Sequence, residues 1–215
     1  MPSPDPRPRG RYVVLEGGEG VGKTTQVRRI VDRLGANGIA ATPIREPGGD
    51  PFAEAGRALL LGDLDREPEA EALLFNALRA QVLHTRVLPA LAQGTWVIAD
   101  RSRLSTIAYQ GHGHGLDLAW TRAVCASVTS LCPPDLEIIL HVDEATAAQR
   151  RADRGTTDRF ELLDHGFHRR VVAGYLAEAE ECGIPVIDAG GTETEVEAAI
   201  WDVLEPLLPA RPVLR

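Results

Sequence analysis

A glycine-rich turn between an apolar run and an amphipathic segment places the strongest constraint on this chain. Gly17, Gly22, Lys23 and Thr24 satisfy the pattern G-x-x-x-x-G-K-[ST], directly after the apolar run "RYVVLE". A strand, this turn and then a helix form the context that a phosphate-binding loop requires. Glycines let successive backbone N–H groups converge on a phosphate, and the N-terminus of the following helix adds a favourable dipole. The sequence therefore predicts a nucleotide phosphate site in this turn.

The side chains of the turn predict how a triphosphate is held. We expect a nucleoside triphosphate to be bound by Gly17, Gly18, Glu19, Gly20, Val21, Gly22, Lys23, Thr24 and Thr25. Lys23 can reach the terminal phosphates, and the Thr24 hydroxyl can hold Mg²⁺. Asp100 ends the apolar run "TWVIAD" and is expected to bind the same ion, directly or through water. The alternatives are a glycine-rich turn with an exposed lysine, and an ion pair of Asp100 with Arg101.

Apolar runs alternate with longer segments of helical spacing along the chain. The runs lie at 11–17, 40–44, 95–100, 137–142 and 184–189, and the helical segments at 23–36, 52–61, 68–92, 117–131, 144–154, 159–182 and 193–208. Strands that alternate with helices indicate a parallel sheet covered on both faces, an α/β doubly wound architecture. The segment 70–93 is apolar around much of its circumference, which predicts burial against the sheet or against a second subunit.

Composition bounds the class of protein. With 215 residues, 44% of them hydrophobic and 25% charged, the chain fits one soluble domain, expected at 11–208. The proline-rich residues 1–10 and residues 209–215 are predicted to be tails, the first without the apolar segment of a secretory signal. A net charge of −8 argues against a nucleic-acid-binding face, and no run reaches the length of a membrane span. Three cysteines without a CxxC pair favour a reducing cytoplasm.

Three further segments narrow the function. "REPGG" (45–49), "LLFNALRAQ" (73–81) and "DRSRLSTIAYQG" (100–111) follow "EGGEGVGKTTQ" in order. Together they resemble thymidylate kinase from about residue 11 to 208. The resemblance implies the P-loop nucleoside monophosphate kinase fold, a five-stranded parallel sheet flanked by helices with a small lid. It also implies transfer of the γ-phosphoryl group of ATP to dTMP with Mg²⁺, giving dTDP and ADP for dTTP biosynthesis, and a homodimer.

The resemblance also assigns the phosphate and the ring of dTMP to particular residues. Arg45 and Arg101 would grip the phosphate, because the planar fork of arginine matches phosphate oxygens. Phe75 would stack on thymine, and Arg79, one helical turn later, would reach a thymine carbonyl.

The rest of the acceptor set lies in "LSTIAYQG", together with the acid of the phosphate loop. Ser105, Thr106 and Gln110 would contact the pyrimidine edge, and the sequence does not assign the contact to one of them. Tyr109 would crowd the 2′ position of the sugar and favour deoxyribose. Glu19 would act near the sugar and phosphate of dTMP.

The expected lid at 149–161, "QRRADRGTTDRFE", supplies positive charge that the phosphate loop lacks, since Gly20 rather than an arginine follows Glu19. Its arginines are Arg150, Arg151, Arg154 and Arg159. The resemblance is to the bacterial arrangement and implies a catalytic role for Arg154 first and Arg150 second, beside Lys23 and Arg101. The alternative is an ordinary solvated face, because acidic residues interleave the arginines.

Two departures from the family pattern concern Ser102 and His114, which stand where an aromatic or histidine and an arginine are common. His112 and His114 lie in "QGHGHG", expected to be a glycine-rich loop, and are too few for a metal site. The competing functions are another P-loop nucleotide kinase, and a P-loop regulatory NTPase without a monophosphate acceptor.

Overall fold

The computed structural model describes residues 9–154, 159–160 and 162–209, apart from the side chain of Arg154. The greater part of the two expected tails, at 1–8 and 210–215, lies outside the described residues. So does the centre of the expected lid, at 155–158 together with residue 161.

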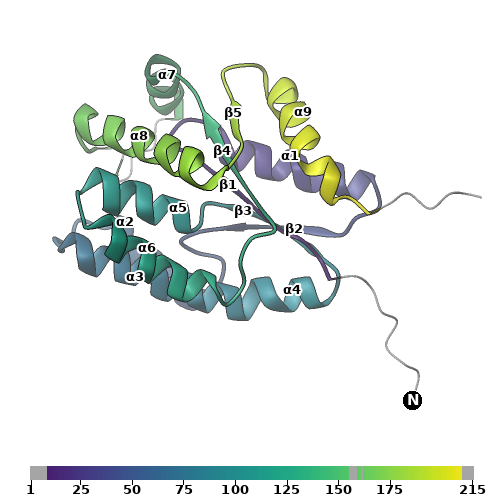
Figure 1. The fold of residues 1–215 in the computed structure, drawn as a ribbon, viewed down its shortest axis with the longest axis horizontal. Helices are drawn as coiled ribbons and strands as arrows, with labels where there is room; N and C mark the ends of the chain where they lie inside the picture. The colour runs from purple at the N-terminus through teal and green to yellow at the C-terminus, as the bar shows by residue number, and fades with distance from the viewer. Residues whose placement is uncertain (1–8, 155–158, 161, 210–215) are drawn as a thin grey trace, which may run out of the picture.

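One parallel sheet organises the chain, with the strand order β2-β3-β1-β4-β5 (Figure 1). The strands are β1 (Tyr12–Glu16), β2 (Ala41–Arg45), β3 (Trp96–Asp100), β4 (Leu136–His141) and β5 (Val186–Asp188). Each lies within two residues of the apolar run that predicted it. The five-stranded, all-parallel sheet flanked by helices confirms the fold class expected from the sequence.

Helices cover both faces of the sheet. They are α1 (Lys23–Ala36), α2 (Pro51–Leu61), α3 (Pro68–Val82), α4 (Leu88–Ala92), α5 (Arg103–Thr106), α6 (Leu118–Thr129), α7 (Glu144–Arg154), α8 (His165–Cys182) and α9 (Glu193–Leu204), with π-helical turns η1 (Leu83–Val87) and η2 (Ile107–Gly113) and the 3₁₀ turn η3 (Glu205–Leu207). In the described part of the chain, no helix has the length and apolar character that a membrane crossing needs.

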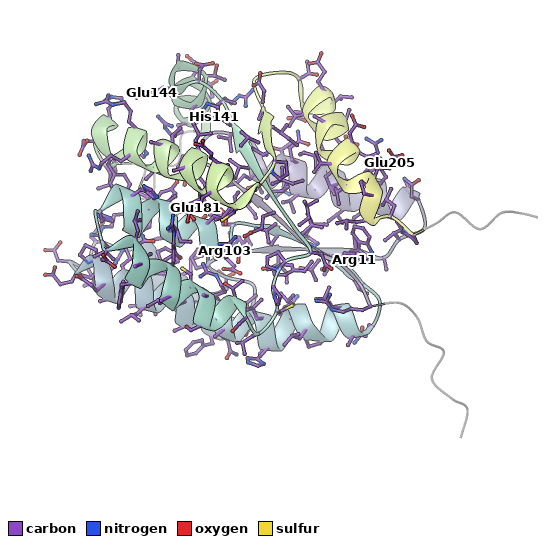
Figure 2. All side chains as sticks on the ribbon, viewed as in Figure 1. Arg11, Arg103, His141, Glu144, Glu181 and Glu205 are labelled. Carbon is purple, nitrogen blue, oxygen red and sulfur yellow. The ribbon has the colours of Figure 1, made fainter. Side chains whose placement is uncertain are left out.

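The central strand shows how the core is divided. Val13 and Leu15 of β1 pack with α1 and α9, whereas Tyr12 and Val14 pack with α3 and η1 on the opposite face. Side chains alternate across a strand, so a run that is apolar at every position can be buried on both faces. Figure 1 shows α1 and α9 on one side and α3 and α4 on the other. Exposed charged side chains such as Glu181 and Glu205 lie on the outer helices (Figure 2).

The segment 103–113 corrects the expectation of a glycine-rich loop, because α5 and η2 make it helical. The glycines there serve close packing between helices. A Cβ atom on Gly113 would lie 2.7 Å from the ring of Phe167, and one on Gly174 would lie 2.6 Å from the ring of His112. Contacts so close favour glycine on a packed helix even though glycine lowers helix propensity.

Two helix boundaries differ from the sequence pattern. The helix expected from residue 159 begins at His165, where the side chain of Asp164 accepts the backbone N–H of Phe167 as an N-cap. The helix expected over 68–92 is one continuous helical path that passes through the π turn η1 before α4. It buries one face and leaves Leu73 half exposed, so the sheet covers only part of its apolar surface.

The carboxyl ends of the three adjacent strands β2, β3 and β1 bring the predicted site together. In the register of the sheet, Asp100 lies beside Leu15 on one side and beside Arg45 on the other. Ligands of open α/β sheets bind at this edge. The chain enters β1 at the opposite edge, where the N–H of Gly10 donates to the carbonyl of Leu91.

Candidate active site

The phosphate loop follows β1 and takes a conformation that only glycine adopts without strain. Gly17 and Gly20 have φ values of 134° and 80°. A Cβ atom at Gly17 would lie 2.3 Å from the carbonyl oxygen of Leu140, and one at Gly20 would lie 2.6 Å from that of Ala147. The loop is therefore pressed against β4 and α7, which leaves its inner side open for a ligand.

Lys23 is folded back across this loop. Its Nζ atom donates to the carbonyl oxygens of Gly18 at 2.7 Å and Gly17 at 3.1 Å. The side chain is only 6% exposed. Burial, together with the neighbouring positive charge of Arg101, lowers the pKa of Lys23 from 10.5 to about 8. The Lys23 ammonium group therefore lies where the negative charge of a bound phosphate would stabilise its protonated form.

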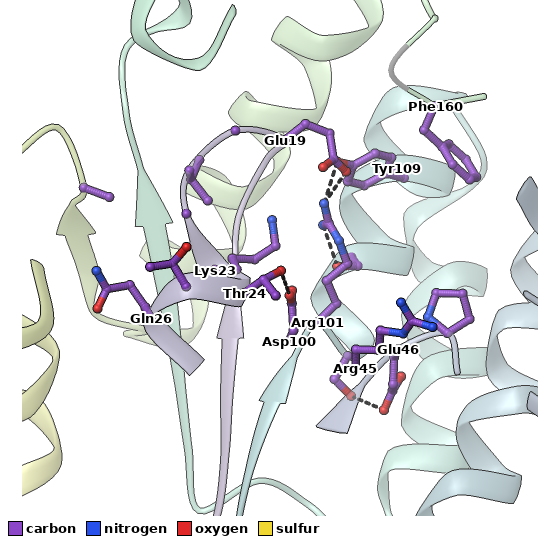
Figure 3. Close-up of a pocket in the computed structure, with 18 of the residues that line it drawn as sticks. Glu19, Lys23, Thr24, Gln26, Arg45, Glu46, Asp100, Arg101, Tyr109 and Phe160 are labelled. Carbon is purple, nitrogen blue, oxygen red and sulfur yellow. Dashed lines mark hydrogen bonds and ion pairs between the residues drawn. The ribbon is translucent and has the colours of Figure 1, made fainter. Parts of the chain in front are cut away.

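Thr24 and Asp100 provide an oxygen pair beside the loop (Figure 3). The Thr24 hydroxyl donates to Oδ2 of Asp100 at 2.5 Å, across from α1 to the end of β3. Hydroxyl and carboxylate oxygens are the hard donors that Mg²⁺ prefers, and one or two such ligands suffice when substrate phosphates supply others. The two residues fit the magnesium site expected from the sequence.

A cavity of about 770 Å³ extends from the phosphate loop to α3 and η2. Of the expected site residues, it is lined by Glu19, Gly20, Val21, Gly22, Lys23, Thr24, Thr25, Arg45, Phe75, Arg79, Asp100, Arg101, Ser105, Thr106, Tyr109, Gln110 and Arg150. Gly17 and Gly18 line a second cavity of about 310 Å³ on the other side of the loop. Residues from distant parts of the sequence therefore share one hollow.

Arg101 lies at the centre of this cavity, directly after β3. It forms an ion pair with Glu19 and donates to the carbonyl of Gly17 at 3.0 Å. Its guanidinium also reaches the hydroxyls of Tyr109 at 3.2 Å and Tyr175 at 3.1 Å. The residue has a φ of 73°, which a non-glycine residue rarely adopts. The Glu19 carboxylate inside the phosphate loop thus faces a cation, which answers why an acid is tolerated there.

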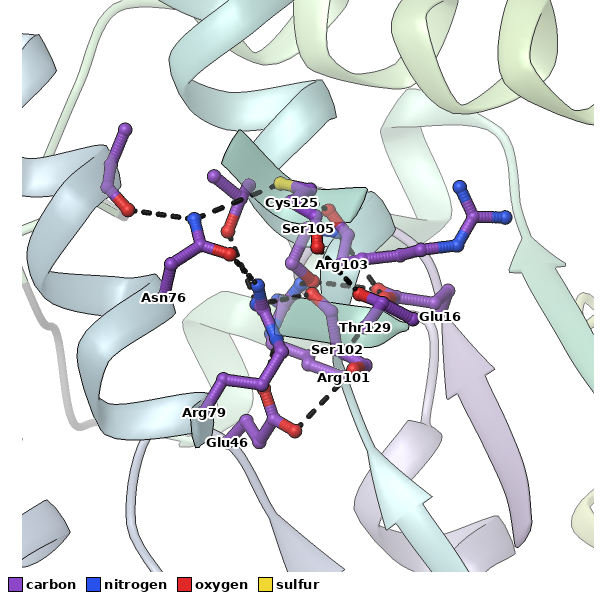
Figure 4. A network of polar contacts seen from close by, with 12 residues as sticks. Glu16, Glu46, Asn76, Arg79, Arg101, Ser102, Arg103, Ser105, Cys125 and Thr129 are labelled. Atoms are coloured by element: carbon purple, nitrogen blue, oxygen red, sulfur yellow. Dashed lines mark hydrogen bonds and ion pairs between the residues drawn. The ribbon is translucent and has the colours of Figure 1, made fainter. Parts of the chain in front are cut away.

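Arg79 lies in the wall of the cavity and is held by a buried network (Figure 4). Its Nε donates to Glu46 at 2.7 Å, and its other nitrogens donate to Asn76 at 2.7 Å and Thr106 at 3.1 Å. The Arg79 side chain is 2% exposed. Burial raises the pKa of Glu46, and the charge of Arg79 offsets part of that rise. The network fixes the guanidinium before any ligand arrives.

Arg45 differs from Arg79 in its exposure. It ends β2 and pairs with Glu54 of α2 at 3.0 Å, with both side chains about half exposed. An exposed pair of this kind contributes little to stability and exchanges partners easily. Arg45 is therefore available to an anion that enters the cavity from solvent.

An aromatic cluster forms the far wall. The ring of Phe160 lies 6.1 Å from that of Phe75 and 5.8 Å from that of Tyr109, the latter edge to face. Figure 3 shows Phe160 beside Tyr109. Phe160 falls inside the expected lid, where the sequence pattern predicts no role for it. The feature that could have indicated a role for Phe160 is its position as the one aromatic residue in the charged segment 149–161.

Other lining residues were also missed. They include Gln26, Glu46, Arg57, Leu61, Ala189, Thr192, Glu193 and Val196. Glu46 is part of the quoted segment "REPGG", so its place next to Arg45 was visible in the sequence. Thr192 and Glu195 form a capping box at the start of α9, and the turn before it closes the cavity on the donor side.

The arginines of the expected lid lie in different surroundings. Arg150 lines the main cavity and donates to the carbonyl of Ala189 at 3.0 Å. Arg151 lines the second cavity, and Arg159 donates to the carbonyl of Leu64 at 3.2 Å. Arg154 is the last residue of α7, and its side chain lies outside the described residues.

Of the two positions that depart from the family pattern, Ser102 lines the main cavity and His114 does not. The N–H of Ser102 donates to Glu16 at 2.7 Å and its hydroxyl to Glu46 at 3.3 Å, so the small side chain fits into the buried network. Nε2 of His114 lies 3.8 Å from a carboxylate oxygen of Glu71.

Comparisons with known proteins agree with this geometry. The thymidylate kinase family model matches residues 15–200. A thymidylate kinase of Deinococcus radiodurans is 45% identical over 196 residues, which cover 90% of this chain and 95% of that protein. One of Chromohalobacter salexigens is 46% identical over 198 residues, 89% of this chain and 93% of that protein. One of Cereibacter sphaeroides is 42% identical over 214 residues, 95% and 99% respectively. The chain therefore belongs to the thymidylate kinase family.

Proposed function

We propose that this protein transfers the γ-phosphoryl group of ATP to dTMP and releases ADP and dTDP, a step toward dTTP. One observation carries the proposal: a single cavity joins a phosphate loop at one end to an arginine and aromatic set at the other. A donor triphosphate and an acceptor monophosphate can then meet between Lys23 and Arg101. Membership of the thymidylate kinase family supports dTMP as the acceptor.

The donor end is suited to ATP. The open backbone N–H groups of the loop and the N-terminus of α1 receive the phosphates, and Lys23 turns from the loop carbonyls to the terminal phosphate oxygens. Thr24 and Asp100 hold Mg²⁺, directly or through water. When bound, the ion neutralises charge that develops on the phosphate oxygens.

The acceptor end is suited to a thymidine monophosphate. Phe75 stacks on the base, and Arg79, held by Glu46, donates to a thymine carbonyl. Arg45 and Arg101 hold the 5′-phosphate, which replaces their present carboxylate partners Glu54 and Glu19.

The polar side chains around the acceptor base and sugar belong to the same helical segment. Ser105 and Thr106 lie two and one positions before η2, at the end of α5, and Gln110 lies within η2. Tyr109 lies against the sugar, and Glu19 remains near the sugar and phosphate through its bond with the Tyr109 hydroxyl at 2.9 Å.

The transfer itself requires positioning and charge stabilisation. An oxygen of the dTMP phosphate attacks the γ-phosphorus in line, the bond to the β–γ bridging oxygen breaks, and ADP leaves. Lys23 and Arg101 stabilise the equatorial oxygens of the transferred group. Arg150 approaches the donor from α7, and Arg154 at the end of that helix is the first choice for the lid arginine that closes over ATP.

The location and the macromolecular partners of the protein are also proposals. We place the protein in the cytoplasm and expect a homodimer with no membrane or nucleic-acid partner. Phe52, Leu59 and Leu73 of α2 and α3 are more than half exposed, and a second copy of the chain would cover them. Sedimentation at micromolar concentration distinguishes a dimer from a monomer.

A coupled assay of ADP release tests the function across nucleoside monophosphates. We expect turnover with dTMP to exceed that with AMP, GMP and dCMP. High activity on AMP or GMP without activity on dTMP would favour another P-loop nucleotide kinase. ATP hydrolysis that no monophosphate stimulates would favour a regulatory NTPase.

A further inference from the structure

A buried carboxylate lies behind the acceptor wall and holds one of its polar side chains. Nε2 of Gln110 donates to Oε1 of Glu71 at 2.8 Å. Glu71 is 2% exposed and Gln110 is 1% exposed. Gln110 lines the nucleotide cavity, whereas Glu71 approaches it from α3 and is not part of the lining. The contact therefore joins the wall of the cavity to the layer behind it.

The second oxygen of Glu71 is fixed independently. Oε2 accepts from Nε of Arg66 at 2.8 Å and lies 3.8 Å from Nη1 of Arg159. Arg66 is anchored in turn to the carbonyl oxygens of Leu59 at 2.8 Å and Leu64 at 3.2 Å. With Oε2 occupied and the carboxylate held in place, Oε1 accepts from the amide of Gln110 and also lies 3.8 Å from Nε2 of His114.

This arrangement decides which end of the Gln110 amide is presented to a ligand. A rotation of the amide by 180° would bring its oxygen to the carboxylate oxygen of Glu71, and two acceptors at that distance repel each other. The amide nitrogen therefore stays on Glu71, and the oxygen is turned away from it. In the described part of the chain, Oε1 of Gln110 is buried and has no hydrogen-bond donor. A buried acceptor without a donor is costly, so a ligand that supplies one is favoured.

We propose that Glu71 sets the base selectivity of the acceptor site by holding Gln110 as a hydrogen-bond acceptor. This inference rests on the proposed function. Thymine carries a hydrogen on N3 and donates to the Gln110 oxygen. Cytosine carries a lone pair on N3, so it would place two acceptors against each other. Uracil has the same N3–H as thymine. Glu71 is thus a positioning residue that separates thymine and uracil from cytosine and is indifferent to the 5-methyl group.

The test compares three acceptors on the Glu71→Gln variant. An amide at position 71 can donate or accept, so the Gln110 amide is free to turn and to present its NH₂ group. We expect the ratio of kcat/KM for dTMP to that for dCMP to fall roughly tenfold, the scale of one misplaced hydrogen bond. The ratio for dTMP to dUMP should stay unchanged. A ratio compares two substrates on the same folded enzyme, so partial unfolding lowers both rates alike.

A matched control separates the amide orientation from the ion pair. Arg66→Gln removes the cation on Oε2 of Glu71 but leaves the carboxylate that holds Gln110. We expect this variant to keep the wild-type dTMP to dCMP ratio. The proposal would be overturned if the dTMP to dCMP ratio fell equally in Glu71→Gln and Arg66→Gln, or if the dTMP to dUMP ratio fell as well. Either result would show a general distortion of the pocket.

A second substitution keeps the proposal testable if Glu71→Gln does not fold. Gln110→Leu removes the acceptor with little change in volume, and kcat/KM should fall for dTMP but not for dCMP. If both variants retain the wild-type ratio, the proposal is wrong. Wild-type protein that is inactive on dTMP would instead defeat the proposed function, so the two failures are distinguishable.

Discussion

The two ends of the cavity are built in opposite ways. The donor end is built mainly around one contiguous stretch of chain, residues 17–25, whose turn leaves backbone groups open. The acceptor end comes from several separate elements, among them β2, α3, α5 and η2, and offers side chains that are already paired. Arg45 pairs with Glu54, Arg79 with Glu46, and Arg101 with Glu19.

The two ends of the cavity lose different contacts when they bind a phosphate. The loop loses only water and two bonds from Lys23 to its own carbonyls. At the acceptor end, the phosphate must replace carboxylates, and the cost depends on how deeply each pair is buried. Arg79 is the most deeply buried of the three arginines and the least able to exchange partners, which suits a fixed contact to a base rather than to a phosphate.

The largest effect is expected where a buried pair is broken. Arg79→Met leaves Glu46 buried without its cation and should lower the free energy of unfolding by about 3–5 kcal/mol. Urea denaturation followed by circular dichroism measures it. The double variant with Glu46→Gln removes both charges and should recover part of the loss. A change of less than about 1 kcal/mol would mean that this pair behaves like a surface pair.

The next effect concerns the donor end. Lys23→Ala should lower kcat roughly 10²- to 10³-fold, the scale of losing one charged contact to the transition state. The melting temperature should be unchanged or higher, because the variant no longer buries an ammonium group. Turnover and thermal melting on the same sample check both parts. Near wild-type turnover would refute the role of Lys23.

The pH dependence of ATP binding sharpens the comparison further. The free protein holds Lys23 charged below its pKa of about 8 and neutral above it. Bound phosphate favours the charged form, so the Kd for ATP should rise roughly tenfold from pH 7 to pH 9. Calorimetry at three pH values measures this. Lys23→Arg, which stays charged, should show a flat profile, and a flat profile in the wild type would contradict the shift.

The lowered pKa of Lys23 affects folding stability and ATP binding in opposite directions as the pH rises. The pKa of Lys23 is lower in the folded chain than its ordinary value of 10.5. The cost of burying the charge is therefore fully present below pH 8 and is relieved as the pH rises through about 8. This contribution of Lys23 should favour the folded state more at pH 9 than at pH 7.

The smallest effect is expected at the exposed pair of the acceptor end. Glu54→Gln removes the carboxylate that competes with substrate for Arg45 and should lower the KM for dTMP roughly two- to fivefold. The free energy of unfolding should change by about 0–1 kcal/mol. Arg45→Ala is the matched control and should raise the KM instead. An unchanged KM in both variants would mean that Arg45 does not meet the phosphate.

The contrast between the two ends also explains what the sequence could predict. The strands and most helices followed from apolar periodicity, and the donor end followed from one short pattern whose geometry is local. The residues of the acceptor end were named through resemblance, but their partners Glu46 and Glu71 were not. A buried carboxylate has the same letter in the sequence as a solvated one, and only the fold shows which arginine or amide faces it.

The helical segment 103–113 shows a second limit. Its glycines at 111 and 113 read as loop residues, because glycine is unfavourable inside helices. Their value comes from η2 lying against α8, where the ring of Phe167 leaves no room for a Cβ atom on Gly113. That contact joins residues 54 positions apart in the chain, so no local window contains it.

The direction of the strands has a practical consequence. All five strands run toward the edge that carries the cavity, and the described chain enters β1 at the opposite edge through Arg9 and Gly10. Helix α9 runs back from the cavity side, so η3 also ends away from it (Figure 1). A fluorescent label or a solid support attached at Arg9 or at the end of η3 would therefore leave the approach of nucleotides unobstructed.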